Sequence, residues 1–261
     1  MILDRFRMTG QVAIVTGAGR GIGRAIAETL GEVGASVACA ARTQAHIEDA
    51  AEKIRSLGQR ALAIPCDVND RAQLENLVSE TIDEFGRIDV VVNNAGGTPP
   101  RPVLRTSERM FEGAFRFNVT SGFLLSRFAI PHMLERDGGA IVNISSAMSN
   151  FVEPGFVAYG TAKVALNHMT RLLAHELAPR VRVNAIAVGS VETDALTPFL
   201  SDDIRRKMED LTPMARLGTT EDIALAALYL ASPAAKWVTG KIFEIDGGLV
   251  HSNWPLDVSE F

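Results

Sequence analysis

A tyrosine and a lysine four positions apart, Tyr159 and Lys163, are the residues of this 261-residue chain whose spacing most clearly suggests chemistry. Residues at this spacing lie on one face of a helix, one turn from each other. A free phenol has a pKa of about 10, so tyrosine exchanges protons poorly at neutral pH unless its phenolate is stabilised. A lysine ammonium nearby provides that stabilisation. Such a pair also occurs by chance on surface helices, so its meaning depends on the rest of the chain.

A glycine-rich segment near the N-terminus gives the pair its context. Thr16–Gly23 directly follows an apolar run, Val12–Thr16, and leads into an amphipathic one. Glycines let the backbone approach a pyrophosphate, and the first turn of a helix offers free N–H groups and a partial positive charge. This context favours a dinucleotide site over a merely flexible turn. Together with Tyr159 and Lys163, it predicts hydride-transfer chemistry.

The end of the second predicted strand, Ser36–Ala41, indicates which nicotinamide cofactor binds. NAD sites usually carry a carboxylate there, whereas an arginine nearby accommodates the 2′-phosphate of NADP. This chain has Arg42 and Thr43 at that point, and Arg20 in the glycine-rich segment adds a second cation. We therefore expect NADP(H) to be preferred, with NAD(H) possible, although Arg42 also fits a solvated strand end. Asp67, after the third predicted strand, could bond to the adenine or cap the next helix, and the sequence favours neither.

Short apolar runs alternate with longer amphipathic runs along the chain. The short runs are β-branched and nearly continuous in apolar residues, as in strands buried on both faces. They are Val12–Thr16, Ser36–Ala41, Ala61–Cys66, Ile88–Val92, Ala140–Ser145, Arg182–Ala187 and Lys241–Ile245. The helical patterns are Gly23–Val33, Ala45–Leu57, Ala72–Phe85, Ser107–Leu134, Ala158–Leu177 and Asp222–Leu230. This alternation predicts an α/β fold, in which residues 1–261 form a single Rossmann-type domain: a doubly wound parallel sheet of about seven strands with helices on both faces.

Two segments interrupt this alternation. Residues 96–102 are too rich in proline for a helix or a central strand. Residues 189–217 lie between a strand and the last helix. Extra loop segments on such a fold usually lie over the carboxyl ends of the strands, where ligands bind, so we expect both to form walls of a substrate pocket. The apolar candidates in the second segment are Ala195, Leu196, Phe199, Leu200, Met208 and Met214.

The composition excludes several classes of function. A formal net charge of −5 disfavours a nucleic-acid binder, since phosphate neutralisation needs a basic surface. No apolar stretch has the length of a signal peptide or a membrane span, so we expect a cytoplasmic protein without a membrane partner. The five histidines do not cluster with other ligands at metal-binding spacing, which disfavours a metal site. Cys39 and Cys66 are interpreted as small buried apolar residues rather than a disulfide framework.

Several short motifs follow one another in the order and spacing of a known family. They are Thr16-Gly-x-x-x-Gly-x-Gly23, Asn93-Asn94-Ala95-Gly96, Asn118, Ser146, Tyr159-x-x-x-Lys163 and Asp246-Gly247-Gly248. From about Gln11 to Gly248 the chain resembles the short-chain dehydrogenases/reductases, NAD(P)(H)-dependent enzymes that act on CH–OH groups. Residues 93–102 and 193–240 look particularly like those of bacterial 7α-hydroxysteroid dehydrogenases, and 3-oxoacyl-(acyl-carrier-protein) reductases are similar more generally. The chain departs from the family at Val188, where a proline is usual, and residues 250–261 extend past the usual end of the fold.

The resemblance implies a catalytic role for four residues. Tyr159 would exchange a proton with the substrate oxygen, and Lys163 would lower the pKa of that tyrosine and hold the nicotinamide ribose. Ser146 would bond to the substrate carbonyl, and Asn118 would hold a water that connects Lys163 to solvent. Without the resemblance, Asn118 is more simply interpreted as a helix-interior asparagine that bonds its own backbone. Ser145 is the rival of Ser146, but the family spacing selects Ser146, and alternation along a strand predicts that the two side chains face opposite ways.

The residues expected to contact the cofactor lie mostly where predicted strands end. They are Gly17, Gly19, Arg20, Gly21, Ile22, Gly23, Arg42, Thr43, Asp67, Val68, Asn94, Ala95, Gly96, Tyr159, Lys163, Gly189, Val191 and Thr193. Asn93, together with Gly96, is expected to brace the sheet and the adenosine side rather than to do chemistry.

These observations lead us to expect an NADP(H)-dependent oxidoreductase that interconverts a ketone and a secondary alcohol on an apolar, hydroxysteroid-like small molecule. A 3-oxoacyl thioester is the alternative substrate, for which Arg101, Arg105 and Arg205–Lys207 could form a basic rim, although a run like the last is more often a solvated helix face. A non-catalytic dinucleotide-binding regulator is the alternative from another class, and the complete Ser146, Tyr159 and Lys163 set argues against it. The resemblance also implies a homotetramer or homodimer formed through the two long helices.

Overall fold

The computed structural model describes residues 1–194, 196–197, 200–255 and 258. Two of the apolar residues expected to line a pocket, Ala195 and Phe199, lie outside these residues, as does most of the chain beyond Pro255. Within the described ranges, no helix combines the length and apolar character needed to cross a membrane.

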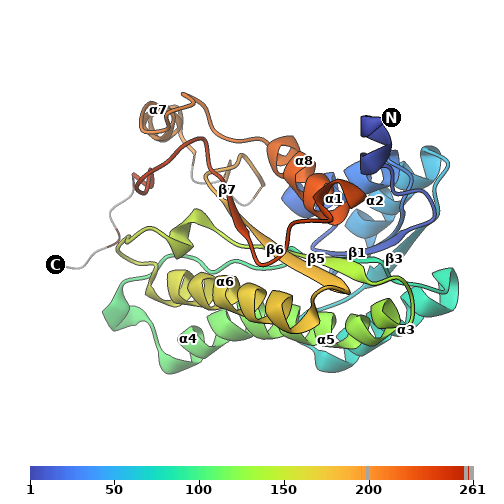
Figure 1. Cartoon of the computed structure of the whole chain (residues 1–261). Helices are drawn as coiled ribbons and strands as arrows, with labels where there is room; N and C mark the ends of the chain where they lie inside the picture. The colour runs from blue at the N-terminus through green and yellow to red at the C-terminus, as the bar shows by residue number, and fades with distance from the viewer. Residues whose placement is uncertain (195, 198–199, 256–257, 259–261) are drawn as a thin grey trace.

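The described strands form one open sheet in which all neighbours are parallel, in the order β3-β2-β1-β4-β5-β6-β7 (Figure 1). They are β1 Val12–Thr16, β2 Ser36–Ala41, β3 Ala61–Pro65, β4 Val90–Asn93, β5 Gly139–Ile144, β6 Val181–Val188 and β7 Ile242–Ile245. From β1 the sheet grows in one direction through β2 and β3, and in the opposite direction through β4 to β7. A crevice forms at the carboxyl ends of the strands where this order switches, between β1 and β4. The predicted doubly wound parallel sheet is confirmed.

Helices cover both faces of the sheet (Figure 1). One face carries α1 Gly21–Glu32, α2 Gln44–Ser56 and α8 Thr220–Ala231, and the other carries α3 Arg71–Phe85, α5 Ser121–Leu134 and α6 Val157–Leu177. The strands β1 to β6 supply both cores, because successive side chains point to opposite faces. In β1, Ala13 and Val15 enter the first core and Ile14 enters the second, and all three are fully buried.

The remaining elements are short. They are α4 Glu108–Phe115, α7 Asp202–Asp210, the π-helical turn Arg116–Thr120, and the 3-10 turns Ile2–Phe6, Val103–Arg105, Ala147–Ser149 and Pro233–Ala235.

Two predictions about elements were wrong. The single long helix expected over Ser107–Leu134 is interrupted by the π-helical turn Arg116–Thr120, which separates α4 from α5. The segment expected to be loop over residues 189–217 contains α7, which begins after Ser201. Met208 is the only buried residue of α7, so its apolar pattern is too sparse to stand out in the sequence. Other boundaries differ by a few residues, as helix and strand ends commonly do.

Candidate active site at the carboxyl edge of the sheet

The glycine turn between β1 and α1 is fixed to the neighbouring strand. Gly17 has a φ of 67°, and a Cβ atom there would lie 2.6 Å from Nδ2 of Asn94, so only glycine fits this position without strain. The backbone N–H groups of Asn94 and Ala95 donate to Oγ1 of Thr16 at 3.0 and 3.1 Å. Asn94 Nδ2 also donates to the Thr16 carbonyl at 2.8 Å. These bonds hold the turn, and the N-terminus of α1 that follows it, at the crevice between β1 and β4.

Two arginines beside this turn are available to a ligand. Arg20 and Arg42 are exposed, and neither side chain has a hydrogen bond or ion pair to any described residue. Arg24, on the same helix as the turn, is by contrast engaged by Glu28 at 2.7 Å and by Asp49 at 2.5 Å. These two cations are therefore free to bond to an anionic group of a ligand held at the turn.

Asp67 does not cap the helix that follows it. Asp70 caps α3, because its carboxylate accepts from the backbone N–H groups of Ala72 at 2.9 Å and Gln73 at 3.4 Å. The carboxylate of Asp67 instead accepts from the backbone and side-chain nitrogens of Asn69, at 2.9 and 3.1 Å. The helix-cap alternative for Asp67 is therefore wrong, and its contact with an adenine stays a prediction. Its predicted neighbour in the site, Val68, is buried in the core.

Ser146 and Tyr159 meet where β5 ends and α6 begins. Ser146 follows β5 and caps the 3-10 turn Ala147–Ser149, where its Oγ accepts from the Met148 backbone N–H at 3.2 Å. Its side chain lies beside that of Tyr159, in the first turn of α6, and acts to lower the pKa of that tyrosine. Ser145 Oγ is buried and has no hydrogen-bond partner among the described residues. The geometry therefore brings Ser146, and not its neighbour, to the tyrosine.

Lys163 lies on α6 one turn after Tyr159, and its side chain faces the ring of that tyrosine. Its Nζ donates to the carbonyl of Ile144 at 2.8 Å and lies 5.6 Å from the centroid of the tyrosine ring. Burial lowers the pKa of Lys163 to about 7. Burial also raises the pKa of Tyr159, and the neighbouring Ser146 side chain opposes this rise only in part. We expected Lys163 to lower the pKa of Tyr159, but without a bound cofactor the pKa of Tyr159 is raised. The reason is that desolvation favours the neutral forms of both the tyrosine and the lysine.

The π-helical turn brings Asn118 to the same place. Its Nδ2 donates to the Ala114 carbonyl at 2.9 Å, which is the backbone bond that the simpler interpretation predicts. Its Oδ1 accepts from the Gly97 backbone N–H at 2.8 Å, so the side chain also holds the loop of residues 96–102. A Cβ atom on Gly96 would lie 2.9 Å from Asn118 Oδ1 and 3.3 Å from Lys163 Nζ. Gly96 is thus packed against these two side chains, whereas we expected it to brace the adenosine side, and the water expected at Asn118 stays a prediction.

A buried polar chain behind these residues was missed by the sequence reasoning. Asn93 Nδ2 donates to Asn143 Oδ1 at 2.8 Å and to Ser126 Oγ at 3.0 Å, and Asn143 Nδ2 donates to Thr170 Oγ1 at 2.9 Å. The chain ties β4 to β5 and to the helix that carries Tyr159. Asn93 thus braces the sheet, and Asn143 could have been found as a polar residue inside an otherwise apolar strand.

The turn after β6 closes the opposite side of the crevice. Val188, in place of the usual proline, is the last residue of β6 and pairs in register with Ile245 of β7. Thr193 faces the glycine turn, since a Cβ atom on Gly21 would lie 3.7 Å from its Cγ2. Val191 forms a parallel bridge with Gly218. Two of the predicted cofactor residues, Gly21 and Thr193, are therefore brought together although they are far apart in the sequence.

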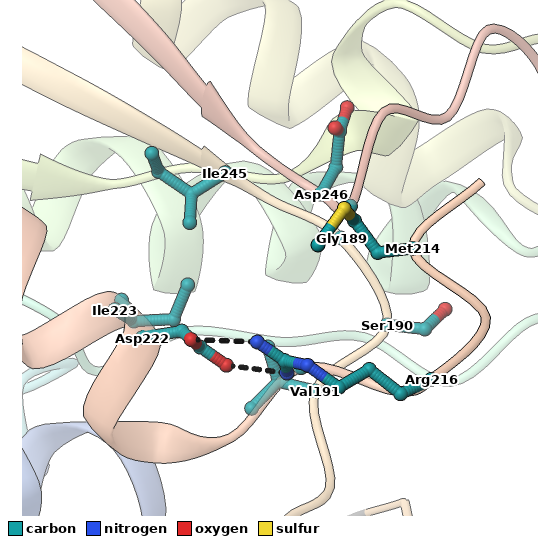
Figure 2. A pocket seen from close by; sticks show the side chains of 11 residues that line it. Gly189, Ser190, Val191, Met214, Arg216, Asp222, Ile223, Ile245 and Asp246 are labelled. Atoms are coloured by element: carbon teal, nitrogen blue, oxygen red, sulfur yellow. Dashed lines mark hydrogen bonds and ion pairs between the residues drawn. The ribbon is translucent and has the colours of Figure 1, made fainter. Parts of the chain in front are cut away.

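A small cavity of about 100 Å³ lies beside this turn (Figure 2). It is lined by Gly189, Ser190, Val191, Met214, Arg216, Gly218, Asp222, Ile223, Ile245, Asp246 and Gly247. Across it, Arg216 donates to both carboxylate oxygens of Asp222, at 2.8 and 3.0 Å. Neither Tyr159 nor Lys163 lines this cavity, so it flanks the site rather than forming its centre. Within the described ranges, no group of three or more histidine, cysteine, aspartate or glutamate side chains is arranged to hold a metal ion.

Comparison with known proteins places this geometry in a family. A family model described as enoyl-(acyl carrier protein) reductase matches residues 17–250. An uncharacterized oxidoreductase of Mycobacterium tuberculosis is 47% identical over 100% of both chains, and the 7α-hydroxysteroid dehydrogenase of Escherichia coli K12 is 39% identical over 94% of this chain and 96% of its own length. A solved structure of 7α-hydroxysteroid dehydrogenase complexed with NADH and 7-oxo glycochenodeoxycholic acid matches with a TM-score of 0.92 at 39% identity, covering 95% of this chain and 97% of that one. The chain therefore belongs to the short-chain dehydrogenases/reductases, enzymes that bind a nicotinamide dinucleotide and act on the hydroxyl and keto groups of small molecules.

Proposed function

We propose that this protein is an NADP(H)-dependent oxidoreductase that interconverts a ketone and a secondary alcohol on an apolar, hydroxysteroid-like substrate. The observation that carries the proposal is the convergence of Ser146, Tyr159 and Lys163 at the carboxyl edge of the sheet. The glycine turn and the two uncommitted arginines lie at the same edge. A non-catalytic protein that only binds a dinucleotide would need the glycine turn and the arginines, but it would not need Ser146, Tyr159 and Lys163 to converge.

The cofactor would be held by groups from three strand ends. The N-terminus of α1 offers N–H groups to the pyrophosphate, and Thr193 faces it from the other side of the crevice. Arg20 and Arg42 would bind the 2′-phosphate, which is the contact that favours NADP(H) over NAD(H). Bound in this way, the cofactor supplies or accepts a hydride at C4 of the nicotinamide.

The protein's own groups would handle charge and protons at the substrate oxygen. Ser146 donates a hydrogen bond to that oxygen and stabilises the negative charge that develops on it during reduction. Tyr159 donates its hydroxyl proton to the same oxygen in reduction and accepts a proton from it in oxidation. Lys163, as an ammonium, stabilises the resulting phenolate. Asn118, which packs against Gly96 as Lys163 does, would hold a water that connects the lysine to solvent.

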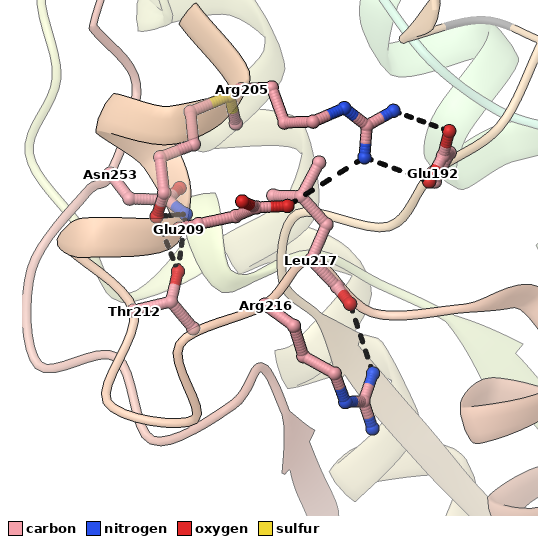
Figure 3. A network of polar contacts seen from close by, with 8 residues as sticks. Glu192, Arg205, Glu209, Thr212, Arg216, Leu217 and Asn253 are labelled. Atoms are coloured by element: carbon pink, nitrogen blue, oxygen red, sulfur yellow. Dashed lines mark hydrogen bonds and ion pairs between the residues drawn. The ribbon is translucent and has the colours of Figure 1, made fainter. Parts of the chain in front are cut away.

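The pairing of Arg205 with two carboxylates favours apolar ring compounds over acyl thioesters as the substrate. A carrier protein or thioester phosphate needs a basic rim, and Arg205 was a candidate for it. Arg205 is already engaged by Glu192, with one bond at 3.0 Å and another at 2.5 Å, and it lies 3.7 Å from Glu209 (Figure 3). The description of the matching family model nevertheless keeps an acyl substrate as the second candidate.

Turnover is tested by nicotinamide absorbance with a panel of hydroxysteroids, acetoacetyl thioesters and simple ketones or alcohols, run with NADP(H) and NAD(H) in parallel. We expect turnover of the ring compounds with NADP(H). Tyr159→Phe should lower that turnover by about 10²- to 10⁴-fold, the range of general acid–base catalysis, and leave NADPH binding unchanged. Full activity in this variant would overturn the mechanism, and tight NADPH binding with no turnover on any substrate would favour the regulator.

We also propose that the chain assembles as a homotetramer or homodimer through its long helices. Apolar side chains on α6 and α5 are partly exposed: Val164 is 49%, Leu172 59% and Phe123 40% exposed. Light scattering of the wild type should give a multiple of 28.1 kDa, and Leu172→Glu should shift the mass toward 28.1 kDa. A wild-type protein of 28.1 kDa would contradict the proposal.

A further inference from the structure

The short turn that carries Ser146 is closed by both polar groups of Ser149. The Ser146 carbonyl accepts two hydrogen bonds from Ser149, one from its backbone N–H at 2.9 Å and one from its Oγ at 2.7 Å. Ser146 Oγ in turn accepts from the Met148 backbone N–H at 3.2 Å. A hydroxyl has a single hydrogen and two acceptor sites, so the bond from Met148 leaves the hydrogen of the Ser146 hydroxyl available for donation.

A buried amide on α6 holds the hydroxyl of Ser149. Asn167 is 5% exposed, and its Nδ2 donates to Ser149 Oγ at 2.8 Å. The bonds around Ser149 fix the orientation of this amide, because Ser149 gives its only hydroxyl hydrogen to the Ser146 carbonyl and can only accept from Asn167. A continuous chain of hydrogen bonds therefore runs from the amide, through the Ser149 hydroxyl, to the backbone of Ser146.

Asn167 lies on the same face of α6 as Tyr159 and Lys163. The three residues are four positions apart, so they follow one another along that face, one turn at a time. The turn also packs directly on the start of the helix, since a Cβ atom on Gly160 would lie 3.2 Å from the Met148 carbonyl oxygen. One helix thus carries the tyrosine and the lysine and also holds the turn that presents the serine.

The bond to Ser149 is what this amide adds to the protein interior. Asn167 Oδ1 is buried and accepts no hydrogen bond from any described residue. A leucine has nearly the same shape and would bury apolar atoms in place of this oxygen, so burial alone does not require an asparagine here. The hydrogen bond from Nδ2 is the one interaction that a leucine could not provide.

We propose that Asn167 and Ser149 are positioning residues of the reaction: they fasten the turn of Ser146 to the helix of Tyr159 and so fix the distance between the two hydroxyls. The inference rests on the proposed function and deepens it. Both hydroxyls must reach the same substrate oxygen, and a displacement of about 1 Å in such a site can lower the rate about 10²-fold. In this role Asn167 and Ser149 act through Ser146 and not on the substrate.

Kinetics with NADPH and 2-decalone, an apolar two-ring ketone, test this role. Ser149→Ala and Asn167→Leu should each lower kcat about tenfold and change KM less than about twofold, because Ser146 acts on charge that develops in the transition state. Ser149→Thr keeps the hydroxyl and should restore most of kcat. Ser56→Ala is the matched control, because Ser56 Oγ also donates to the carbonyl three residues earlier, that of Lys53 at 2.6 Å, but at the end of α2 on the other face of the sheet. If Ser149→Ala and Asn167→Leu keep the wild-type kcat, as Ser56→Ala should, the proposal is wrong.

A double variant separates positioning from a general loosening of the site. Ser146→Ala should lower kcat by about 10²- to 10³-fold, and adding Asn167→Leu to it should lower kcat no further, because the amide acts only through this serine. Thermal unfolding should show that Asn167→Leu alone keeps nearly the wild-type midpoint, since one hydrogen bond and one unpartnered oxygen are removed together. Effects on kcat that multiply in the double variant, or a loss of stability with an unchanged kcat, would assign Asn167 a structural role and overturn the proposal.

Hydrogen exchange separates this inference from the proposed function. The Met148 and Ser149 N–H groups donate to Ser146, so their exchange rates report on the turn without any substrate. Mass spectrometry of peptides that cover residues 145–151 should show exchange about tenfold faster in Asn167→Leu, with no change over residues 12–16. Faster exchange in this variant, without turnover of 2-decalone by the wild type, would support the fastening of the turn and contradict the proposed reaction on ring ketones. Turnover by the wild type, with neither exchange nor kcat changed in Asn167→Leu, would contradict the positioning role and leave the reaction standing.

Discussion

The two sides of the crevice are built differently. On the cofactor side, the turn after β1 is set by backbone conformation and by its bonds to Asn94 and Ala95 of the neighbouring strand end. On the substrate side, the loop after β6 and the end of the chain are held by side chains, among them Asn253 and the Glu192–Arg205 pair. A turn that requires the positive φ of a glycine such as Gly17 tolerates few substitutions, whereas a loop held by pairs of side chains can change its residues while the fold persists. This difference explains how one fold keeps a cofactor and changes its substrate.

The largest effect should come from breaking the backbone of the cofactor side. Gly17→Val places a β-branched residue at a φ of 67° and a Cβ atom 2.6 Å from Asn94 Nδ2. Backbone strain of about 1–3 kcal/mol together with this contact should raise the Kd of NADPH about 100-fold, measured by fluorescence titration.

A matched glycine tests whether the position or the strain matters. Gly58 has a φ of 83° just after α2, and a Cβ atom there would meet no heavy atom within 4 Å. Gly58→Val should lower the free energy of unfolding by a similar strain and leave the Kd of NADPH unchanged. If both variants weaken NADPH equally, the turn is not the cofactor cradle.

The next effect concerns the phosphate end of the cofactor side. Arg42→Ala removes one charge-assisted hydrogen bond, so the Kd of NADPH should rise by about 10- to 100-fold, while the Kd of NADH should stay within about twofold. Arg24→Ala is the control, because Arg24 is already paired with Glu28 and Asp49. Equal weakening of NADPH and NADH by Arg42→Ala would contradict the assignment of NADP(H).

The same contrast explains what the sequence could predict. The sheet, its strands and the glycine turn follow from patterns of contiguous residues, and these patterns gave the fold class and placed each strand to within two residues at either end. The π-helical turn at Asn118 was missed because nothing in the local pattern separates it from a helix. The bonds of Asn167 to Ser149, and of Asn253 to Thr212 and Ser190, were missed because these partners lie 18 to 63 positions away in the sequence. Contacts at such separations follow from the completed fold and leave no local pattern to read.

A smaller effect should appear in the pH dependence of the site. Burial lowers the pKa of Lys163 to about 7, so its ammonium form, which would stabilise the phenolate, is present below that pH and is lost above it. The kcat/KM for NADPH, which reports on the free enzyme, should therefore fall about tenfold per pH unit above pH 7. Lys163→Arg keeps its charge at all these pH values and should lack this step, whatever its absolute rate. A step near pH 7 that persists in Lys163→Arg would belong to another group.

The smallest effect should come from the substrate side, where an ion pair is partly exposed. Bonds from Arg216, and from the backbone and hydroxyl of Thr219, hold the pKa of Asp222 well below its ordinary value of about 3.9. A carboxylate whose pKa is lower in the folded state stabilises the fold above the unfolded pKa, and this contribution is lost as the pH falls through the folded value. Asp222→Asn should therefore lower the free energy of unfolding at pH 7 by less than about 1 kcal/mol, because solvent screens the pair. The measurement is the urea midpoint of Asp222→Asn and of the wild type, and the difference between the two should narrow below about pH 4. Glu221→Gln is the control, because Glu221 lies one residue earlier on the same exposed turn, and its urea midpoint should equal that of the wild type. A gap that stays constant from pH 7 to pH 3 would mean that the charge of Asp222 does not hold this loop, and that packing alone does.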